Sequence, residues 1–529
     1  MTGAAASAHE AEPSPLEVLR NRPFLLLWLS QLATQVGGNM AVYGLTVIVF
    51  NTTGSSSAVS VLLLTFLAPA VLFSALAGVF VDRLDRRWIL LITNVLRGLA
   101  TLALFVLVKN IAAVFILNVL ISTITVFFAP AEAAMIPTLV PRSLLLAANS
   151  LFVFTLNTAF AIGFALLGPL IARLAGPEEL LIAVGVLYLL AAVFCLLLPK
   201  SPPVEATEKG GAGLADAERA IGATIDQLRE GIAYIRAHAT IAWSLLYLGI
   251  AASLIGVLGV IGPKFARDTL GLSTSDFVVV VLPMGAGVVL GVLTLNSYGR
   301  WLPRRRAIEG GMMALGALIV LLTAAGPISE FLQGVQSQVP TAVDLSRFVS
   351  LLAVVVVIAF VAGVAYAFVA IPAQTQLQEE LPEDVRGRVF GVLNMLVSVA
   401  SFVPIILVGA IIDALGKNGT TVVIIAVGLI ILVLGVASIL VRGPLEASEA
   451  AKRADTTAHP PGPVDAVAVA YRTEAELARG EPRRGPPARP TEPAVDVADA
   501  LDHSRVLVPS RSGEPSDREA PGKAGASED

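Results

Sequence analysis

The chain has 529 residues, of which 56% are hydrophobic and 14% are charged, and its formal net charge is −4. Soluble domains contain about a quarter charged residues, so this composition excludes an ordinary soluble protein and indicates a chain embedded in lipid. The basic residues lie beside apolar stretches rather than in a stripe, which argues against nucleic acid as a partner. The single cysteine, Cys195, and four histidines outside the apolar stretches provide neither a disulfide nor a metal site, so we expect no metal and no cofactor.

Twelve apolar stretches are long enough to cross a bilayer, whose core of about 30 Å requires about 20 residues in helical form. Backbone groups in hydrocarbon must bond internally, and the alternation of a β-barrel is missing, so we predict helices. The predicted spans are 24–50, 57–81, 88–108, 111–130, 146–172, 179–198, 241–263, 277–297, 307–326, 347–371, 389–411 and 420–441. The predicted fold class is an all-α membrane protein with two pseudo-symmetric six-helix bundles, 24–198 and 241–441.

Lys and Arg are distributed unequally between alternate loops, and positive residues stay on the cytoplasmic side of a membrane. One set of loops is rich in arginine, as at Arg20, Arg83 and Arg300. The opposite set contains only Lys109, Arg173, Lys264, Arg267 and Lys417. We therefore predict a multi-pass protein of the cell membrane with both ends in the cytoplasm, and the excess of Arg over Lys suggests a bacterial gene.

Four segments lie outside the spans. Residues 1–23 form a predicted cytoplasmic tail, and 199–240 form a cytoplasmic linker that contains an amphipathic helix at Ile221–Ile235, suited to the lipid surface. Residues 328–346 are predicted as an outer loop. Residues 442–529 are rich in Pro, Ala and charged residues and are predicted to be disordered.

The two halves of the sequence resemble each other. Pro130 and Pro141 at the end of the fourth span match Pro372 and Pro382 at the end of the tenth, and the group Arg83…Arg86-Arg87 matches Arg300…Arg304-Arg305. Parallel repeats of six spans are a known plan of secondary transporters, with the substrate site at the interface of the repeats.

The loop after the second span reads Gly78-Val-Phe-Val-Asp82-Arg83-Leu-Asp85-Arg86-Arg87. It resembles the signature Gly-x-Leu-Ala-Asp-Arg-x-Gly-Arg-Arg/Lys of the major facilitator superfamily, from which Phe80 and Asp85 depart. With Arg386-Gly-Arg-Val-Phe-Gly391, it is similar to the branch of siderophore and macrolide exporters, of the enterobactin exporter type. The resemblance covers about 24–441. The residues that match this gating loop are Gly78, Asp82, Arg83, Arg86 and Arg87.

The resemblance implies roles for this loop. Gly78 would permit close helix approach, and Asp82 would act as a latch against the eleventh helix. The arginines would bridge helix ends across the halves, or they act only as topology signals. In the fifth span, Gly168 and Pro169 match part of the antiporter motif of exporters in this superfamily. Gly-Pro bends a helix and frees a carbonyl group, which is also consistent with an ordinary packing kink.

Polar residues in the spans mark the candidate substrate cavity, because polar groups in hydrocarbon need a partner or water. In the superfamily, helices one, four, seven and ten line the central cavity. Interhelical hydrogen bonds are the alternative, worth about 0.6–2 kcal/mol each. The candidates are Gln31, Gln35, Asn39 and Tyr43 on the first helix, Asn118, Ser122 and Thr125 on the fourth, and Tyr247 and Tyr366.

Arg97 and Glu132 are charges inside or near the ends of predicted spans, and we predict a link between them, either structural or with a role toward the substrate. Proton coupling needs a titratable carboxylate in the pathway. No Asp or Glu lies near a predicted midplane, so Glu132, Glu309 and Asp413 remain the candidates.

The leading functional prediction is a secondary transporter that exports amphipathic organic solutes by alternating access, driven by protons. Uptake or facilitated diffusion is a second interpretation, and a membrane sensor or assembly protein on a transporter scaffold is a third. ATP is excluded as the driving ligand because no Gly-x-x-x-x-Gly-Lys-Ser/Thr motif occurs. An enzyme is not predicted, because no cluster of His, Cys or carboxylates shares one membrane depth.

Overall fold

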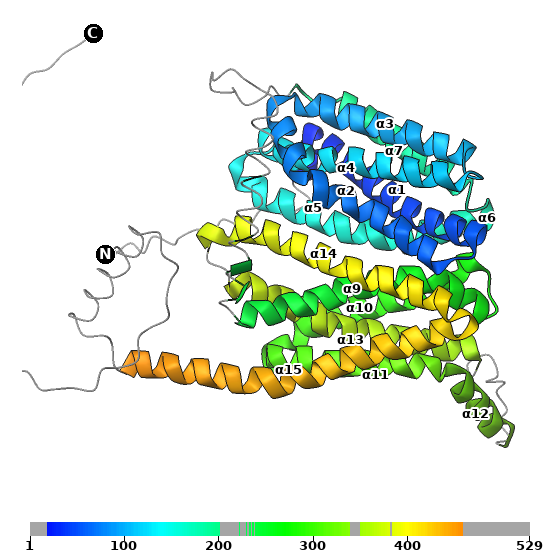
Figure 1. The fold of residues 1–529 in the computed structure, drawn as a ribbon. Coiled ribbons are helices and arrows are strands. Elements are labelled where there is room, and N and C mark those ends of the chain that lie inside the picture. Colours follow the sequence, from blue (N-terminus) through cyan, green and yellow to red (C-terminus); the bar gives the residue numbers. More distant parts are fainter. Residues whose placement is uncertain are drawn as a thin grey trace, which may run out of the picture. The chain divides into compact units, whose positions relative to one another are not determined.

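The computed structural model describes residues 18–200, 239–338, 350–380 and 383–458, with some single positions between 222 and 236. No strand occurs in these ranges, and the long elements are helices (Figure 1). Residues 1–447 form one compact unit, and the described end of the last helix belongs to a second unit, 448–529. The helices are α1 (Arg22–Thr53), α2 (Ser56–Arg83), α3 (Arg86–Val106), α4 (Ile111–Leu139), α5 (Leu145–Phe160), α6 (Gly168–Leu174), α7 (Leu180–Leu196), α9 (Ala239–Asp268), α10 (Val278–Tyr298), α11 (Arg304–Thr323), α12 (Ala325–Gln338), α13 (Leu351–Glu380), α14 (Glu383–Ala414) and α15 (Gly419–Ala458).

The prediction of an all-helical membrane protein is confirmed. Within the described residues, ten helical spans are long and apolar enough to cross a membrane, and α7 and the Val399–Ala414 part of α14 are shorter apolar helices. Each of the twelve predicted stretches lies on one of these helices or includes most of one. Whether all twelve cross the bilayer remains a prediction.

Polar caps fix where the first helices begin. The side chains of Asn21, Ser55, Asp85 and Asn110 accept hydrogen bonds from backbone N–H groups in the first turns of α1 to α4. These donors have no partner within the helix, and each cap contributes about 1 kcal/mol. Gly54 ends α1 with a left-handed φ of 65°, a conformation that glycine adopts without a steric penalty. The connections between these helices are therefore short.

Three segments differ from the expectation. The predicted outer loop 328–346 is helical as far as Gln338, because Ile328, Phe331 and Leu332 have the spacing of one apolar face of α12. Helix α15 continues to Ala458, beyond the predicted span end at 441, through a stretch rich in the helix formers Ala, Glu and Lys. The fifth span is divided into α5, a π-helical segment at Ala161–Leu167, and α6.

The two groups of helices repeat the same arginine contact. Arg87 at the start of α3 donates to the carbonyl oxygen of Leu196 at the end of α7. Arg305 at the start of α11 donates to the carbonyl oxygen of Ile439 in α15, at 3.3 Å. The repeat of arginines predicted from the sequence is thus matched by equivalent contacts in space.

Glycines repeat in the same way. A Cβ atom on Gly98 would lie 3.2 Å from the carbonyl oxygen of Gly185, where α3 meets α7. A Cβ atom on Gly316 would lie 2.7 Å from the carbonyl oxygen of Gly428, where α11 meets α15. Gly98 and Gly316 each follow their arginine, Arg87 or Arg305, by eleven residues. Small residues allow helix backbones to approach closely in a membrane, so both pairs use the same packing device.

The groups α1–α7 and α9–α14 meet at the end where α2 begins and α14 finishes. Figure 1 shows α14 (yellow) beside α2 (blue), and the two helices are in contact. The carboxylate of Asp413 accepts hydrogen bonds from the Ser55 hydroxyl at 2.7 Å and from the backbone N–H groups of Ser56 and Ser57 at 2.9 and 2.8 Å. One carboxylate of the second group therefore caps the first turn of a helix in the first group.

Candidate functional site

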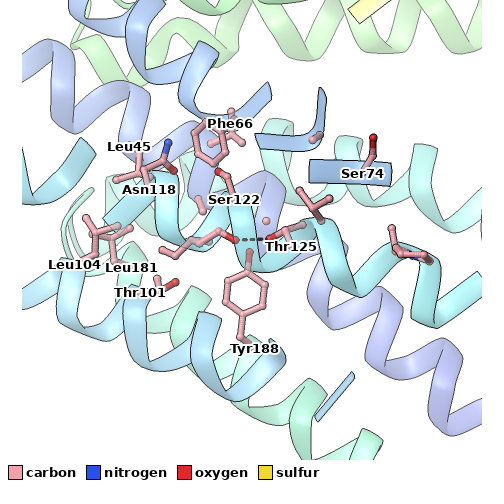
Figure 2. Close-up of a pocket in the computed structure, with 18 residues that line it drawn as sticks. Leu45, Phe66, Ser74, Thr101, Leu104, Asn118, Ser122, Thr125, Leu181 and Tyr188 are labelled. Atoms are coloured by element: carbon pink, nitrogen blue, oxygen red, sulfur yellow. Dashed lines mark hydrogen bonds between the residues drawn. The ribbon is translucent and has the colours of Figure 1, made fainter. Parts of the chain in front are cut away.

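A pocket of about 490 Å³ lies among the helices of the first group. Figure 2 shows Asn118, Ser122, Thr125 and Tyr188 around it. None of the residues that line it is charged. They come from α1, α2, α3, α4 and α7: Gly38, Ala41, Val42, Leu45, Phe66, Ala70, Ser74, Thr101, Leu104, Asn118, Ile121, Ser122, Thr125, Val126, Ala129, Pro130, Leu181 and Tyr188.

Helix α4 brings the predicted residues Asn118, Ser122 and Thr125 to this pocket. The Asn118 amide donates to Thr65 Oγ1 at 2.7 Å, and Thr125 Oγ1 donates to the Ile121 carbonyl of its own helix at 2.8 Å. Asn118 Oδ1 and Ser122 Oγ have no hydrogen-bond partner among the described protein atoms. Two polar groups at the pocket thus keep unused hydrogen-bonding capacity.

The four predicted residues of α1 do not line this pocket. Gln31 is buried and its Oε1 has no protein partner, whereas Asn39 donates to the Gln35 carbonyl one turn earlier at 2.8 Å. Tyr43 is buried, and its hydroxyl donates to the carbonyl of Ser275, just before α10. The Tyr43 ring also stacks on Phe277 at 5.2 Å. Tyr43 therefore joins the two groups of helices, and the pocket is lined by a different face of α1.

Arg97 lies behind the pocket wall and is fully buried. Its guanidinium donates to Asn94 Oδ1 and lies 4.5 Å and 4.8 Å from the ring centroids of Phe128 and Tyr188. Glu132 is also buried, and its Oε1 has no hydrogen-bond partner among the described residues. One amide and two aromatic faces surround the guanidinium. No ion pair joins Arg97 to Glu132 directly, but the two buried groups lie close enough to interact electrostatically, and the predicted link between them remains a prediction.

The gating loop is described only in part, because the side chains of Asp82 and Arg83 lie outside the described residues. Arg86 donates to the Ala134 carbonyl near the end of α4 at 3.2 Å, while Arg87 binds the end of α7. Both of these contacts join helices of the arginines' own half. The expected bridge across the halves remains a prediction, because Arg83 and the side chains at the start of α14 lie outside the described residues. No described atom lies within 4 Å of a Cβ built on Gly78, so the close approach expected there is not found among these residues.

Tyr247 and Tyr366 pack within the second group of helices. Tyr247 is fully buried, stacks on Trp243 at 5.9 Å, and shares a hydrogen bond with the Ser438 hydroxyl of α15. Its ring and hydroxyl are thus used in helix packing, and its cavity role remains a prediction. Tyr366 is partly buried against the apolar cluster around Tyr247 and Met312. The cavity role of Tyr366 remains a prediction.

Gly168 and Pro169 begin α6 directly after the π-helical segment. A Cβ atom on Gly163 would lie 2.5 Å from the carbonyl oxygen of Val36 in α1, and one on Gly168 would lie 3.1 Å from the Tyr43 ring. Short π-helical segments in α-helices are frequent at functional sites. The fifth span therefore contacts α1 closely where its helical geometry changes.

The comparisons with known proteins agree with this architecture. The family profile of the Major Facilitator Superfamily matches residues 27–403. The multidrug efflux pump Tap of Mycolicibacterium fortuitum is 23% identical over 429 residues, which cover 79% of this chain and 95% of Tap. Macrolide efflux protein A of Streptococcus pyogenes is 23% identical over 420 residues, covering 76% of this chain and 94% of that protein.

Solved structures show the same fold. The nucleoside transporter NupG superposes with a TM-score of 0.57 at 15% identity, covering 79% of this chain and 98% of NupG. A bacterial homolog of the human lysosomal transporter Spinster gives a TM-score of 0.56 at 14% identity, covering 81% and 96% of the two chains. The family profile matches well over half of the chain, and this multi-pass membrane protein therefore belongs to the Major Facilitator Superfamily, whose members are transporters and not enzymes.

Proposed function

We propose that this protein is a proton-coupled exporter of amphipathic organic solutes that works by alternating access in the bacterial cell membrane, with both ends of the chain in the cytoplasm. The observation that carries the proposal is the uncharged pocket of about 490 Å³, in which Asn118 Oδ1 and Ser122 Oγ lack protein partners. Its volume lies within the range of about 300–1,000 Å³ that is usual for small-molecule sites. The efflux function in the names of Tap and macrolide efflux protein A supports export.

Alternating access requires contacts between the halves that break on one side of the membrane. The cap of Asp413 on Ser55, Ser56 and Ser57 is such a contact, and with the proposed orientation it lies at the outer face. At the same end, Thr274 donates to Asn51 at 2.6 Å. These contacts would hold the outer ends closed and would have to open when a solute leaves toward the outside.

Glu132 is the carboxylate best suited to coupling. Glu309 accepts a hydrogen bond from Arg305 at 2.7 Å, and Asp413 has three donors, so both carboxylates are already paired. Glu132 is buried on α4, and its Oε1 has no protein partner. Titratable groups inside a membrane bundle mark proton relays by default. Glu132 would bind and release the coupled proton as its access alternates.

Reconstituted full-length protein in liposomes tests the proposal. A panel of dyes, macrolides and siderophores is followed with and without an imposed pH gradient, and protein-free liposomes serve as the control. We expect at least one solute to accumulate on the acidic side, and the accumulation to collapse when a protonophore removes the gradient. Equal equilibration with and without the gradient would identify a facilitated-diffusion carrier instead, and no protein-dependent movement of any solute would contradict transport of this class.

A further inference from the structure

We propose that the transported solute places its uncharged apolar part in the pocket lined by α1, α2, α3, α4 and α7, and not only in the gap between the two halves. Ser122 and Asn118 select the hydrogen-bonding group of that solute. This inference rests on the proposed function and adds a location and a chemical class to it. The inferred occupant is a neutral aromatic or macrocyclic group that carries a polar acceptor or donor.

The pocket has an origin in the divergence of the two repeats. In the second half, α10 and α13 pack backbone to backbone, because Cβ atoms on Gly287 and Gly363 would overlap with carbonyl groups of the opposite helix. Ala70 lies thirteen residues before Arg83, as Gly287 lies thirteen before Arg300. Ile121 lies nine residues before Pro130, as Gly363 lies nine before Pro372.

Ala70 and Ile121, which match the two glycines, both line the pocket. Side chains at these two positions prevent the close backbone contact that their glycine counterparts allow. Helices α2 and α4 are linked instead by the side-chain hydrogen bond between Asn118 and Thr65. The first half therefore has a cavity where the second half has a tight helix contact.

The wall favours an uncharged occupant. No Asp, Glu, Lys or Arg lines the pocket, and a charge in such a site without a partner would carry a large desolvation cost. The positive charge of Arg97 lies 4.8 Å from the ring centroid of Tyr188, and Tyr188 is part of the wall. Arg97 would therefore repel a cation in the pocket across the Tyr188 ring, and no carboxylate lines the wall to offset this repulsion.

The two unpaired polar atoms give the pocket its selectivity. Buried hydrogen-bonding groups that lack a partner cost about 1–3 kcal/mol each, so their retention on one face of α4 indicates a use. Both oxygens are buried in this structure, so the side chains around them have to shift before a solute reaches them. The Ser122 hydroxyl could then donate to an acceptor of the solute or accept from a donor, and Asn118 Oδ1 could accept. Because the Ser122 hydroxyl has no protein partner, Ser122→Ala removes no hydrogen bond from the free protein.

Two probes of similar shape and different charge test the inference by calorimetric titration of the full-length protein in lipid nanodiscs. Triphenylphosphine oxide is neutral and carries one strong acceptor, whereas tetraphenylphosphonium is a permanent cation without one. We expect the oxide to bind at least about tenfold more tightly than the phosphonium. Ser122→Ala should weaken binding of the oxide about fivefold, which corresponds to one ordinary hydrogen bond, and should not weaken binding of the phosphonium.

Two further variants locate the binding. Ala70→Phe places a ring in the pocket and should abolish binding of the oxide. Thr123→Val is the matched control, because Thr123 is on the same helix outside the pocket and bonds only the Val119 carbonyl of its own helix. No binding of the oxide, unchanged binding in Ala70→Phe, or equal or tighter binding of the phosphonium would overturn the inference. The titrations need no pH gradient, so they fail or succeed independently of proton-coupled export.

Discussion

Asp413→Asn is the substitution that should most directly change the balance between closed and open states at the end of the molecule that we propose faces outward. Asp413 Oδ2 accepts from the Ser55 hydroxyl and the Ser57 N–H, while Oδ1 accepts from the Ser56 N–H. An asparagine keeps one of the two oxygens and turns its NH2 group toward at least one backbone N–H group, which cannot accept from it. It also removes a negative charge from the positive end of α2.

The size of the effect follows from these contacts. A hydrogen bond to a charged group contributes about 1.5–3 kcal/mol, and a charge at a helix terminus about 0.3–1 kcal/mol. Asp413 is partly exposed, so solvent screening moves these values to their lower ends, and water replaces part of what is lost. We expect a net change of about 1–2 kcal/mol, which shifts the ratio of closed to open states about five- to thirtyfold toward the open state.

Distance measurements between spin labels check this prediction. Labels at Thr52 and Lys417, both exposed at this end and in different halves, report the separation of the outer ends. The single native cysteine, Cys195, is buried and leaves the background low. Asp413→Asn should increase the population at long distances.

The control is Asp268→Asn, which removes the same charge from an acid paired only with Arg267 of its own helix, at 2.8 Å. Unchanged distances in Asp413→Asn, or an equal shift in Asp268→Asn, would refute the reasoning.

Three other predictions follow. Glu132→Gln should still let solute equilibrate in liposomes but should abolish its accumulation under a pH gradient, while Glu309→Gln, whose carboxylate is paired with Arg305, should retain accumulation. Gly363→Ala should lower the free energy of unfolding by about 1–3 kcal/mol, because the new Cβ would overlap with the Met284 carbonyl. Thermal unfolding in detergent measures this loss. The control is Gly249→Ala, because the nearest atom to a Cβ at that position is 4.0 Å away. Tyr43→Phe removes the hydroxyl contact to Ser275 but keeps the ring on Phe277, so the same spin labels should report a smaller opening than in Asp413→Asn.

The fold was predictable because its signals are local. An apolar stretch of about 20 residues identifies a membrane helix without any knowledge of its neighbours, and the twelve stretches coincide with helices. The arginine repeat was also visible in the sequence, at Arg87 and Arg305. The helical part of the supposed outer loop carried a signal in Ile328, Phe331 and Leu332, whose spacing of three and four residues predicts an apolar helix face.

The sequence predicted which polar residues share one face of a helix, but it did not predict which way that face points. Asn118, Ser122 and Thr125 were found by their spacing, and they reach the pocket. The equally regular stripe of α1 that includes Tyr43 faces other contacts, and the pocket uses a neighbouring face of that helix. Periodicity identifies the residues that share a face, but the direction of that face depends on the neighbouring helices. The same limit applied to Arg97, whose surroundings include Tyr188, far away in the sequence.

The pocket and the proposed coupling carboxylate lie on one helix. The polar wall residue Ser122, the wall residue Pro130 and the buried carboxylate of Glu132 all lie on α4. Glu132 is two residues beyond Pro130 and ten beyond Ser122, a separation of about 15 Å along a helix. A solute that changes the position of this helix would therefore also move the carboxylate, and a proton on Glu132 would in turn alter the pocket. A helix that carries both proposed sites would connect the proposed solute and the proposed proton mechanically, as coupled transport requires.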